Sequence, residues 1–537
     1  MNKKGFTLVE LLGVLIIMSI VLIVVITPIM GQIRNNSKKL DDAALKILYA
    51  STDNYLDGKA YLYPKNDGMI YYVPIGQLID SDNLESNYLS SYSKEVLSRD
   101  NVIKVIVDNG GYEFSFAEDT DGLTTLYSAY QNVENDSVYS FLGGTYFSGS
   151  ASNNYVYYSG LMWRIMGINE DGSIKLIADE SVATLNFGNA NNYDESYANE
   201  WLNNYFISKL KYSDFLVEES ACYVPTETIS KSEDVCESLN DSALGHSKVT
   251  QLSLYEYNMS FLNNYSYLKN GLVFSTSTYS STLTDMLYKI LSDGSITAIS
   301  KNSMHYIRPV ISLMPESVIT SGDGAKNNPY ILFKSSTNIV ESDNRTLNSI
   351  NLASGEYLSL NSKIYRVVES DNSETKLILN DIYKVAEANY SSTFGTSSIF
   401  NTNEGVAGYL KDTLYLEEYT NLNGIVKTKF WYQGDSTVTS TNYKNSSLAK
   451  TNILYGISVG LPKIGEILTV PVYGSATGEF WTMSKSSNTE VYVVTQEGTT
   501  PKNVTLTSYI RPVIIIESEA LIGGGNGTNS TPYIVNY

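Results

Sequence analysis

The stretch YIRPVISL at residues 306–313 recurs almost unchanged as YIRPVIII at residues 509–516. Arg308 and Arg511, which precede the apolar runs, are separated by 203 positions, and we expect each to start a buried terminal strand and to pair with a carboxylate of its own domain. Residues 321–332, SGDGAKNNPYIL, return after the second copy as IGGGNGTNSTPYIV. A spacing near 200 residues is far longer than the ~20–50-residue period of a solenoid, so the pattern predicts two tandem domains.

The same offset continues upstream of these motifs. MWRIMGINEDGSIKLI at 162–177 matches IYRVVESDNSETKLIL at 364–379, and each reads as two strands joined by a polar turn. Asp171 and Gly172 form a typical hairpin turn in the first copy. A helix follows in each copy, because apolar residues recur at three- and four-residue spacing in 196–210 and 403–419. Strands, helix, loops and strands in this order predict an α+β unit.

Composition narrows the class of protein. The chain of 537 residues carries a formal net charge of -20, which disfavours nucleic acid as a partner. Its 43% hydrophobic content allows sizeable cores, and its 44 tyrosines favour short strands over helical bundles.

The cysteines and histidines are few. Cys222 and Cys236 could close a small loop in an oxidising compartment, which stabilises a fold by about 3 kcal/mol. Whether they pair is left open by the sequence. Since His246 and His305 lie away from ligand spacing to a cysteine, we expect no zinc site and no metal.

Residues 6–30 form an apolar run that contains one charge, Glu10. As a helix the run would extend ~37 Å, enough to cross a bilayer. Lys3 and Lys4 favour a cytoplasmic N-terminus. A cleaved secretory signal has a shorter apolar core, and a plain anchor leaves the acid unexplained, because a carboxylate in a bilayer costs roughly 2.5–3.5 kcal/mol.

The stretch KKGFTLVELL resembles the class III leader of type IV prepilins and pseudopilins. The resemblance implies a leader at 1–5, cleavage between Gly5 and Phe6 by a prepilin peptidase, and methylation of the new N-terminal Phe6. It also implies that Glu10 pairs with the Phe6 amine of a neighbouring subunit during assembly. An ammonium partner would offset the cost of the buried carboxylate.

The helix is predicted to continue to residue 58, because Leu40, Ala44, Ile47, Leu48 and Leu56 recur at roughly helical spacing. This helix, 6–58, should pack on a small antiparallel sheet within 59–138 and complete a pilin domain. Asn109, Gly110 and Gly111 separate two strand-like runs there and predict a hairpin.

The two copies share openings of the W-R-[IVL] type, predicted strands FSTS and WTMS at 274–277 and 481–484, and terminal I-R-P-V. These residues resemble the C-type-lectin-like fold of formylglycine-generating-enzyme relatives, which would cover tandem domains at 139–335 and 343–537. The copper-binding thiol pair of the formylglycine-generating enzymes is not matched, because the second copy lacks cysteine and Cys222 and Cys236 of the first copy lie in a loop away from FSTS and YIRP. The Glu-Pro-Asn and Trp-Asn-Asp motifs of calcium-dependent sugar binding do not occur either. We expect no enzyme and no cofactor, since fold alone does not give function.

The prepilin resemblance therefore predicts a type IV pilin-like filament subunit, minor or at the tip, whose two outer domains mediate adhesion. Its partners would be the prepilin peptidase, other pilin subunits, an inner-membrane assembly platform and a surface glycan or protein. It would cross the membrane once before assembly and lie on an extracellular pilus afterwards. The alternative is a pseudopilin of a type II secretion-like or DNA-uptake system.

Overall fold

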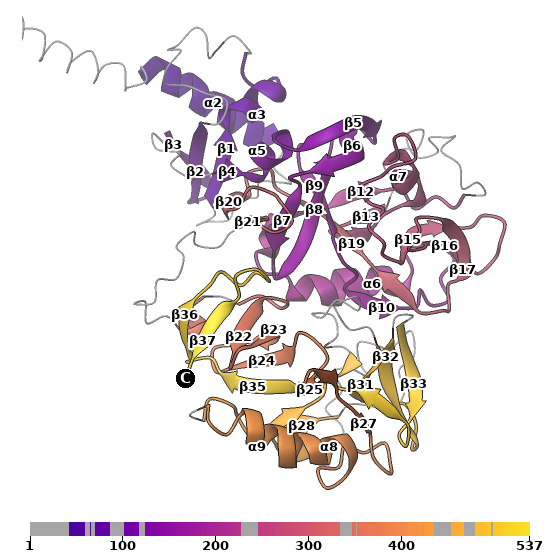
Figure 1. The fold of residues 1–537 in the computed structure, drawn as a ribbon. Helices are drawn as coiled ribbons and strands as arrows, with labels where there is room; N and C mark the ends of the chain where they lie inside the picture. The colour runs from indigo at the N-terminus through magenta and orange to yellow at the C-terminus, as the bar shows by residue number, and fades with distance from the viewer. Residues whose placement is uncertain are drawn as a thin grey trace, which may run out of the picture. The chain divides into compact units, whose positions relative to one another are not determined.

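The computed structural model describes residues 42–58, 65, 70–85, 88, 101–116, 124–226, 245–332, 346–350, 352–422, 424–433, 453–464, 466, 478–495 and 498–537. The chain divides into two compact units, Met1–Asp121 and Gly122–Tyr537. Strands greatly outnumber helices in the described ranges, in agreement with the β-rich character expected for an α+β chain (Figure 1).

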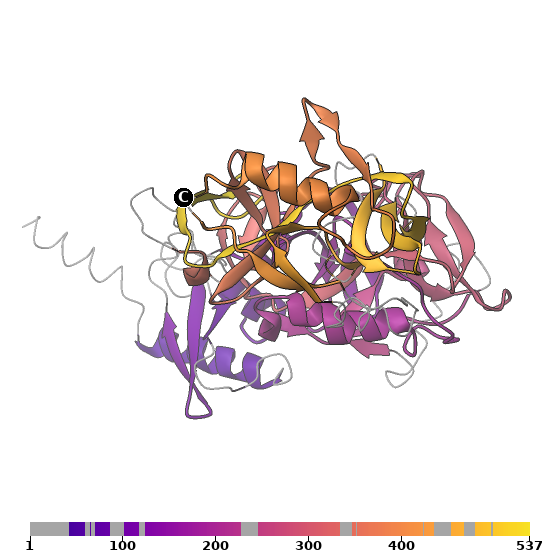
Figure 2. The ribbon, with the colours of Figure 1, turned by 90° about the horizontal axis from the view of Figure 1, so that it is seen from below.

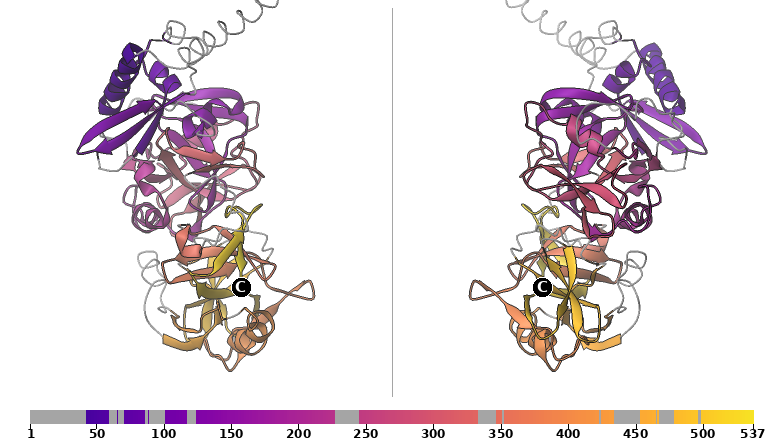
Figure 3. Two further views of the ribbon diagram at one scale, coloured as in Figure 1. Left: turned by 90° about the vertical axis from the view of Figure 1, so that its left-hand side faces the viewer. Right: turned by 90° about the vertical axis from the view of Figure 1, so that its right-hand side faces the viewer.

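The described part of the first unit is a helix beside a small sheet, as expected (Figure 3). Its sheet has the order β1-β2-β3, and both neighbouring pairs are antiparallel. The elements are α2 (Asp42–Gly58), β1 (Ile70–Pro74), α3 (Ile75–Asp80), β2 (Val102–Asp108) and β3 (Gly111–Phe116). Residues 6–41 of the predicted long helix lie outside the described residues.

One face of α2 is buried. Ala44, Leu48 and Leu56 are almost fully buried, and the Tyr49 ring stacks on Phe114 with 5.6 Å between ring centroids. Ile47, which we expected on the same face, is 41% exposed. At 3.6 residues per turn, position 47 lies about 100° away from the centre of the buried face, so the sequence prediction was wrong for this residue.

The turn between β2 and β3 confirms the predicted hairpin. Asn109 and Gly110 have φ values of 50° and 73°, and Asp108 lies opposite Gly111. Positive φ at both central residues defines the turn whose twist suits an antiparallel pair, and Asn-Gly adopts it at low cost.

The boundary between the units differs from our expectation. We expected the small domain to extend to residue 138. Instead β4 (Thr124–Thr125) pairs with β20 (Val318–Ser321), and α5 (Leu126–Gln131) follows directly with Leu126 N donating to Ser317 O. Residues 124–138 therefore belong with the second unit.

The N-terminal half of the second unit, residues 124–332, is built on a sheet of eleven described strands. Its path is β11-β19-β9-β8-β7-β21-β20-β4, with β14 on β19 and the β5–β6 hairpin on β8. The bounds are β5 (Glu134–Phe141), β6 (Gly144–Ser152), β7 (Tyr155–Tyr158), β8 (Leu161–Ile168), β9 (Ile174–Ala178), β11 (Leu216–Val217), β14 (Val249–Gln251), β19 (Pro309–Leu313) and β21 (Tyr330–Leu332).

Smaller elements surround this sheet. The strand pairs are β10-β18 and β12-β13, and β15-β16-β17 form a three-stranded sheet. The bounds are β10 (Ala183–Leu185), β12 (Glu219–Ala221), β13 (Gly245–Ser247), β15 (Phe274–Tyr279), β16 (Met286–Ile290), β17 (Ile296–Ser300), β18 (His305–Ile307), α6 (Tyr197–Trp201), η1 (Leu202–Phe206), η2 (Ile207–Lys209), η3 (Ser213–Phe215) and α7 (Leu254–Met259). The predicted strand at 274–277 and the helix after residue 196 are confirmed.

The C-terminal half, residues 346–537, contains a sheet in the order β30-β35-β24-β23-β22-β37-β36. A second sheet has the order β27-β34-β31-β32-β33. The strands are β22 (Tyr357–Leu360), β23 (Lys363–Ser370), β24 (Glu374–Leu379), β27 (Ser391–Thr393), β30 (Val459–Gly460), β31 (Phe480–Lys485), β32 (Glu490–Thr495), β33 (Gly498–Asn503), β34 (Thr507–Tyr509), β35 (Val513–Glu517), β36 (Leu521–Gly524) and β37 (Tyr533–Asn536).

Two hairpin-like pairs and the helices complete this half. The β25–β26 hairpin stands out from the body of the unit (Figures 2 and 3). The bounds are β25 (Lys384–Val385), β26 (Ala388–Asn389), β28 (Lys429–Tyr432), β29 (Ile453–Ile457), η5 (Leu347–Ser349), α8 (Gly405–Tyr409), η6 (Leu410–Leu414) and α9 (Tyr415–Glu418). In both halves the main helix passes from α-helix into a π-helical turn, at η1 and at η6.

The strand order of the first large sheet recurs in the second. The run β19-β9-β8-β7-β21-β20 corresponds to β35-β24-β23-β22-β37-β36. Both β7–β21 and β22–β37 are parallel pairs, whereas the other neighbours in these two runs are antiparallel. The registers also agree, since Tyr155 lies opposite Arg164 and Tyr357 lies opposite Arg366.

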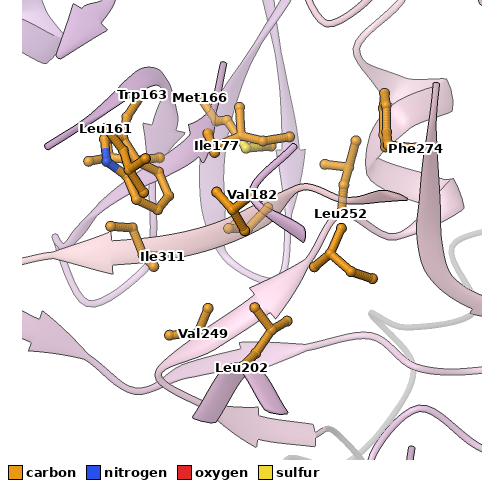
Figure 4. Close-up of a cluster of buried hydrophobic side chains, with 14 of the residues drawn as sticks. Leu161, Trp163, Met166, Ile177, Val182, Leu202, Val249, Leu252, Phe274 and Ile311 are labelled. Atoms are coloured by element: carbon orange, nitrogen blue, oxygen red, sulfur yellow. The ribbon is translucent and has the colours of Figure 1, made fainter. Parts of the chain in front are cut away.

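Two apolar clusters lie inside the second unit. Side chains from β8, β9, β14, β19 and the α6–η1 helix converge on the first, which contains Trp163 (Figure 4). Trp481 lies in the second cluster. Both tryptophans are fully buried. Ile464 and Phe480 of the C-terminal half join the first cluster, so the two halves share apolar contacts and are not independent bodies.

Candidate functional site

The functional residues predicted from the N-terminus, Gly5, Phe6 and Glu10, lie outside the described residues, and their roles stay predictions. Cys222 is buried directly after β12, whereas Cys236 lies outside the described residues, so their pairing also stays a prediction. No described helix is both long and apolar enough to span a bilayer.

A cavity of about 510 Å³ opens in the second unit, between the first large sheet and the second. Leu161, Met162, Val182 and Pro329 form apolar parts of its wall. Its charged lining residues are Asp179, Glu180, Lys326 and Arg366. Cavities of this size, apolar with a few polar groups, are the usual form of small-molecule sites.

Arg366 on β23 reaches the cavity from the C-terminal half. Its Nε donates to Gly355 O at 3.0 Å, and its Nη2 donates to Gly160 O of the N-terminal half at 3.2 Å. The guanidinium lies 4.7 Å from the centroid of the Tyr357 ring. Although the residue is only 3% exposed, its Nη1 makes no hydrogen bond in the described structure.

The turn at Gly160, between β7 and β8, allows this contact. Gly160 has a φ of +75°, and a Cβ added there would lie 2.0 Å from Ser354 O. The backbones therefore approach at a distance that only glycine permits. Tyr157 adds a second link between the halves, because its hydroxyl donates to Gly527 O at 2.7 Å.

The two acidic residues of the cavity, Asp179 and Glu180, directly follow the last residue of β9. Asp179 is 5% exposed, and its Oδ2 lies 3.3 Å from the Nζ of Lys326, in the loop between β20 and β21. Burial alone would lower the pKa of Lys326, but Asp179 outweighs it and the pKa is raised. Glu180 is half-buried and makes neither a hydrogen bond nor an ion pair within the described part of the chain. Burial raises the pKa of its carboxyl, and the charge of Arg366 opposes the rise.

The equivalent arginine of the N-terminal half, Arg164, is fully engaged. Its Nε and Nη2 donate to Asn154 Oδ1 at 3.2 and 2.9 Å, and Nη2 also donates to Ala151 O at 2.8 Å. Its Nη1 donates to Tyr267 O at 2.7 Å. Arg164 therefore bonds only within its own half, whereas Arg366 lines the cavity and keeps one nitrogen, Nη1, without a hydrogen bond among the described residues.

This arrangement can bind a polar ligand. Arg366 offers a donor, and Glu180 offers acceptors on the same cavity. The sequence did not single out Glu180 or Lys326. Arg366 was visible only as the partner of Arg164 in the repeat, and nothing in the sequence distinguished the engaged arginine from the open one.

A serine and a histidine also come together, in a place that the sequence did not predict. Ser275 Oγ lies 2.5 Å from His305 Nδ1, and His305 Nε2 lies 2.8 Å from Ser300 O. A carbonyl only accepts, so Nε2 carries the proton and Nδ1 accepts from the serine. Both residues are 1% exposed, which places the pair in the core, away from any substrate.

Acid should weaken the second unit through His305. Burial lowers its pKa from 6.5 to about 4, so the folded state binds this proton less readily than the unfolded state. The stabilising difference is complete above pH 6.5 and is lost as the pH falls toward 4, by about 3 kcal/mol. Urea unfolding at pH 7 and pH 4 measures this loss, and His305→Gln should reduce it.

His246 in β13 provides the matched control, because it is exposed and is the other histidine of the chain. His246→Gln should leave the loss of stability on acidification close to that of the wild type. An equal loss in the wild type and His305→Gln would contradict the assignment.

Buried ion pairs occupy equivalent places in the two halves. Lys175 Nζ lies 2.7 Å from Glu256 and 3.2 Å from Glu219, and all three are almost fully buried. Burial alone would lower the pKa of Lys175, but the two carboxylates outweigh it and raise the pKa well above its usual value. The second half pairs Lys376 with Glu466.

Glu466 also closes a turn. Its Oε2 accepts from Lys463 N at 2.9 Å, as Glu256 Oε2 accepts from Ser253 N at 2.9 Å. Burial raises the pKa of Glu466, but Lys376 and Lys463 outweigh it and hold the pKa below its usual range. The side chains of Glu466, Lys376 and Lys463 are 7%, 11% and 14% exposed, so they serve the core of this half.

The hydrogen-bond partners of the two repeated arginines, Arg308 and Arg511, differ from our expectation. We expected Arg308 and Arg511 to pair with carboxylates. They are buried as expected, but Arg308 Nε donates to Ala178 O at 2.6 Å and Arg511 Nε donates to Leu379 O at 3.1 Å. Neither forms an ion pair with a described residue. Both arginines are held by backbone carbonyls, because the last residues of the neighbouring strands β9 and β24 place their carbonyl oxygens beside the guanidinium groups.

No cluster of three or more histidine, cysteine or acidic residues suitable for a metal ion occurs among the described residues.

The family model of the prokaryotic N-terminal methylation motif matches residues 1–26. This motif supports a protein of the type IV pilin-like or pseudopilin class, with membrane anchoring first and a pilus at the surface afterwards. It implies processing by a prepilin peptidase and assembly with other pilins. No curated protein and no solved structure matches the chain.

Proposed function

We propose that this chain is a type IV pilin-like filament subunit that displays its second unit outside the cell as an adhesive head. The observation that carries the proposal is the methylation motif at residues 1–26, within which Gly5, Phe6 and Glu10 stand in the prepilin order. The helix α2 beside a three-stranded sheet supports it further, since it supplies the small domain expected after the motif.

The size of the second unit supports a minor or tip position. It spans Gly122–Tyr537, more than three times the length of the first unit. A head of this size on every subunit would crowd a helical filament. A filament built of this chain alone, seen by electron microscopy, would overturn the tip assignment.

The two halves of the second unit are proposed to be tandem copies, with boundaries near 139–335 and 343–537. The matching strand orders and the matching parallel pairs support this origin. The likeness to the C-type-lectin-like fold stays a prediction, as does the absence of enzymatic activity. A binding role follows more directly from the cavity at Arg366, which presents polar groups and no histidine or cysteine among its described lining residues.

Glu10→Ala tests the filament assignment. The variant should still be cleaved after Gly5, because the peptidase acts before assembly, but its incorporation into filaments should fall at least tenfold. The reason is that the carboxylate pairs with the Phe6 amine of the neighbouring subunit only in the filament. Immunoblots of sheared filaments and of membranes measure incorporation and cleavage.

Glu10→Asp keeps the charge and serves as the matched control, with partial incorporation expected. Wild-type incorporation of Glu10→Ala would contradict the assignment. A pseudopilin of a secretion or DNA-uptake system is the other candidate. The charge of -20 speaks against direct DNA binding by this chain.

A further inference from the structure

We propose that the cavity beside Glu180 and Arg366 binds a neutral mono- or disaccharide. The inference rests on the proposed adhesive role of the second unit and names the class of ligand that it would hold. Two groups carry it: the Glu180 carboxylate, which is half-buried without a hydrogen bond, and Nη1 of Arg366, a donor without an acceptor on a side chain that is 97% buried.

The donor and the acceptor both lack a partner within the described residues, so a ligand in the cavity could bond to them without breaking an existing hydrogen bond. A hydroxyl group satisfies both, because it donates to a carboxylate and accepts from a guanidinium. A sugar ring carries several hydroxyls on neighbouring carbons and can reach both groups at once.

The charges favour a neutral ligand. Asp179 and Lys326 pair with each other at 3.3 Å, and Glu180 and Arg366 carry opposite charges on the same cavity. The four side chains thus add no net charge. An acidic ligand would leave Glu180 opposed by a like charge, and a basic ligand would do the same to Arg366.

The apolar wall favours a ring over a smaller polar molecule. Leu161, Met162, Val182 and Pro329 line the cavity, and the C–H face of a sugar can cover such a surface. The volume of about 510 Å³ is within the range that holds drug-sized ligands. A free amino acid would satisfy Glu180 and Arg366 but would leave most of the wall uncovered.

The proposal also explains why one site is expected and not two. Arg164, the equivalent of Arg366, gives its nitrogens to Asn154, Tyr267 and Ala151. Its donors are therefore unavailable to a ligand.

The test uses the full chain purified in detergent and a glycan array that carries lactose, maltose, N,N'-diacetylchitobiose and sialyllactose. We expect binding to at least one of the three neutral disaccharides. Glu180→Gln keeps the side-chain volume and removes the charge, and it should weaken that binding about tenfold. Ser530→Trp, at an exposed position on the cavity lining, should abolish binding by filling the cavity.

Glu195→Gln is the matched control, because Glu195 is exposed and lies away from the cavity lining. It should bind as the wild type does, and thermal unfolding should show all three variants folded. Binding of sialyllactose alone, binding of none of the four sugars, or neutral-sugar binding that Glu180→Gln and Ser530→Trp leave unchanged would overturn the inference.

Adhesion separates this inference from the proposed function. If cells with filaments that contain Glu180→Gln or Ser530→Trp adhere as the wild type does, the saccharide site is wrong and the filament role stands. If the purified wild-type chain binds a disaccharide but never enters filaments, the filament role is wrong and the site stands.

Discussion

Replacing Glu466 with alanine is expected to lower the free energy of unfolding of the second unit by about 3–5 kcal/mol, the usual cost of removing one partner from a buried ion pair. Glu466 is 7% exposed and pairs with Lys376, and Lys463 Nζ lies 3.6 Å away. The substitution leaves the Lys376 ammonium in the core without a carboxylate. It also removes the acceptor of Lys463 N.

Urea unfolding of the full chain, followed by tryptophan fluorescence, measures the loss. Asp412→Ala is the matched control, because Asp412 and Lys411 are both more than half exposed and lie 3.9 Å apart. An exposed pair of this kind contributes ~0–1 kcal/mol, so the control should differ little from the wild type. Similar losses in the two variants would contradict the structural role of Glu466.

The double substitution Lys376→Met with Glu466→Leu separates pairing from burial. It removes both charges and keeps apolar volume in the core, so it should recover much of the stability lost in Glu466→Ala. A double variant as unstable as Glu466→Ala would show that the loss comes from the turn at Lys463 and not from the unpaired ammonium.

Trp163→Ala should cost about 3–5 kcal/mol of stability, the range found when a large buried aromatic side chain is removed. Trp163 is fully buried among side chains of the first cluster (Figure 4). Its Nε1 donates to Tyr158 O at 3.0 Å. The substitution leaves a cavity and removes the hydrogen bond from Nε1 to the Tyr158 carbonyl. The change in urea midpoint measures the effect.

Tyr265→Ala is the control for this experiment, since Tyr265 is 56% exposed. Surface substitutions of this kind usually change stability by no more than about 0.5 kcal/mol. A loss below about 1 kcal/mol for Trp163→Ala would contradict its place in the core.

Local patterns predicted local structure well. Asn109-Gly110 and Asp171-Gly172 both lie at turns between antiparallel strands, because positive φ is a property of one or two residues. Helical spacing after residues 196 and 403 also led to helices. The π-helical turns within them were not predicted, since no periodicity of apolar residues distinguishes one extra residue in a turn.

Long-range contacts explain the errors. Residues 124–138 were assigned to the small domain by their place in the chain, yet the partner of β4 is β20, almost 200 residues later. Arg308 and Arg511 were expected to meet carboxylates, but the carbonyls that accept from them come from β9 and β24. The sequence does not show which strand will end beside each arginine, because the acceptor carbonyl lies about 130 residues earlier in the chain.

The sequence by itself determined the methylation motif, the repeat of about 200 residues, the hairpin turns and the apolar character of the two cores. These features depend on residues that are close in the chain or on a fixed spacing between motifs, so the sequence shows them without knowledge of the fold. Only the tertiary structure decided that all three guanidinium nitrogens of Arg164 make hydrogen bonds, whereas Nη1 of Arg366 makes none among the described residues. The two arginines share one register in equivalent strands, and they differ because Arg366 bonds to the backbone of the other half at Gly160, lines the cavity and keeps Nη1 without a hydrogen bond among the described residues.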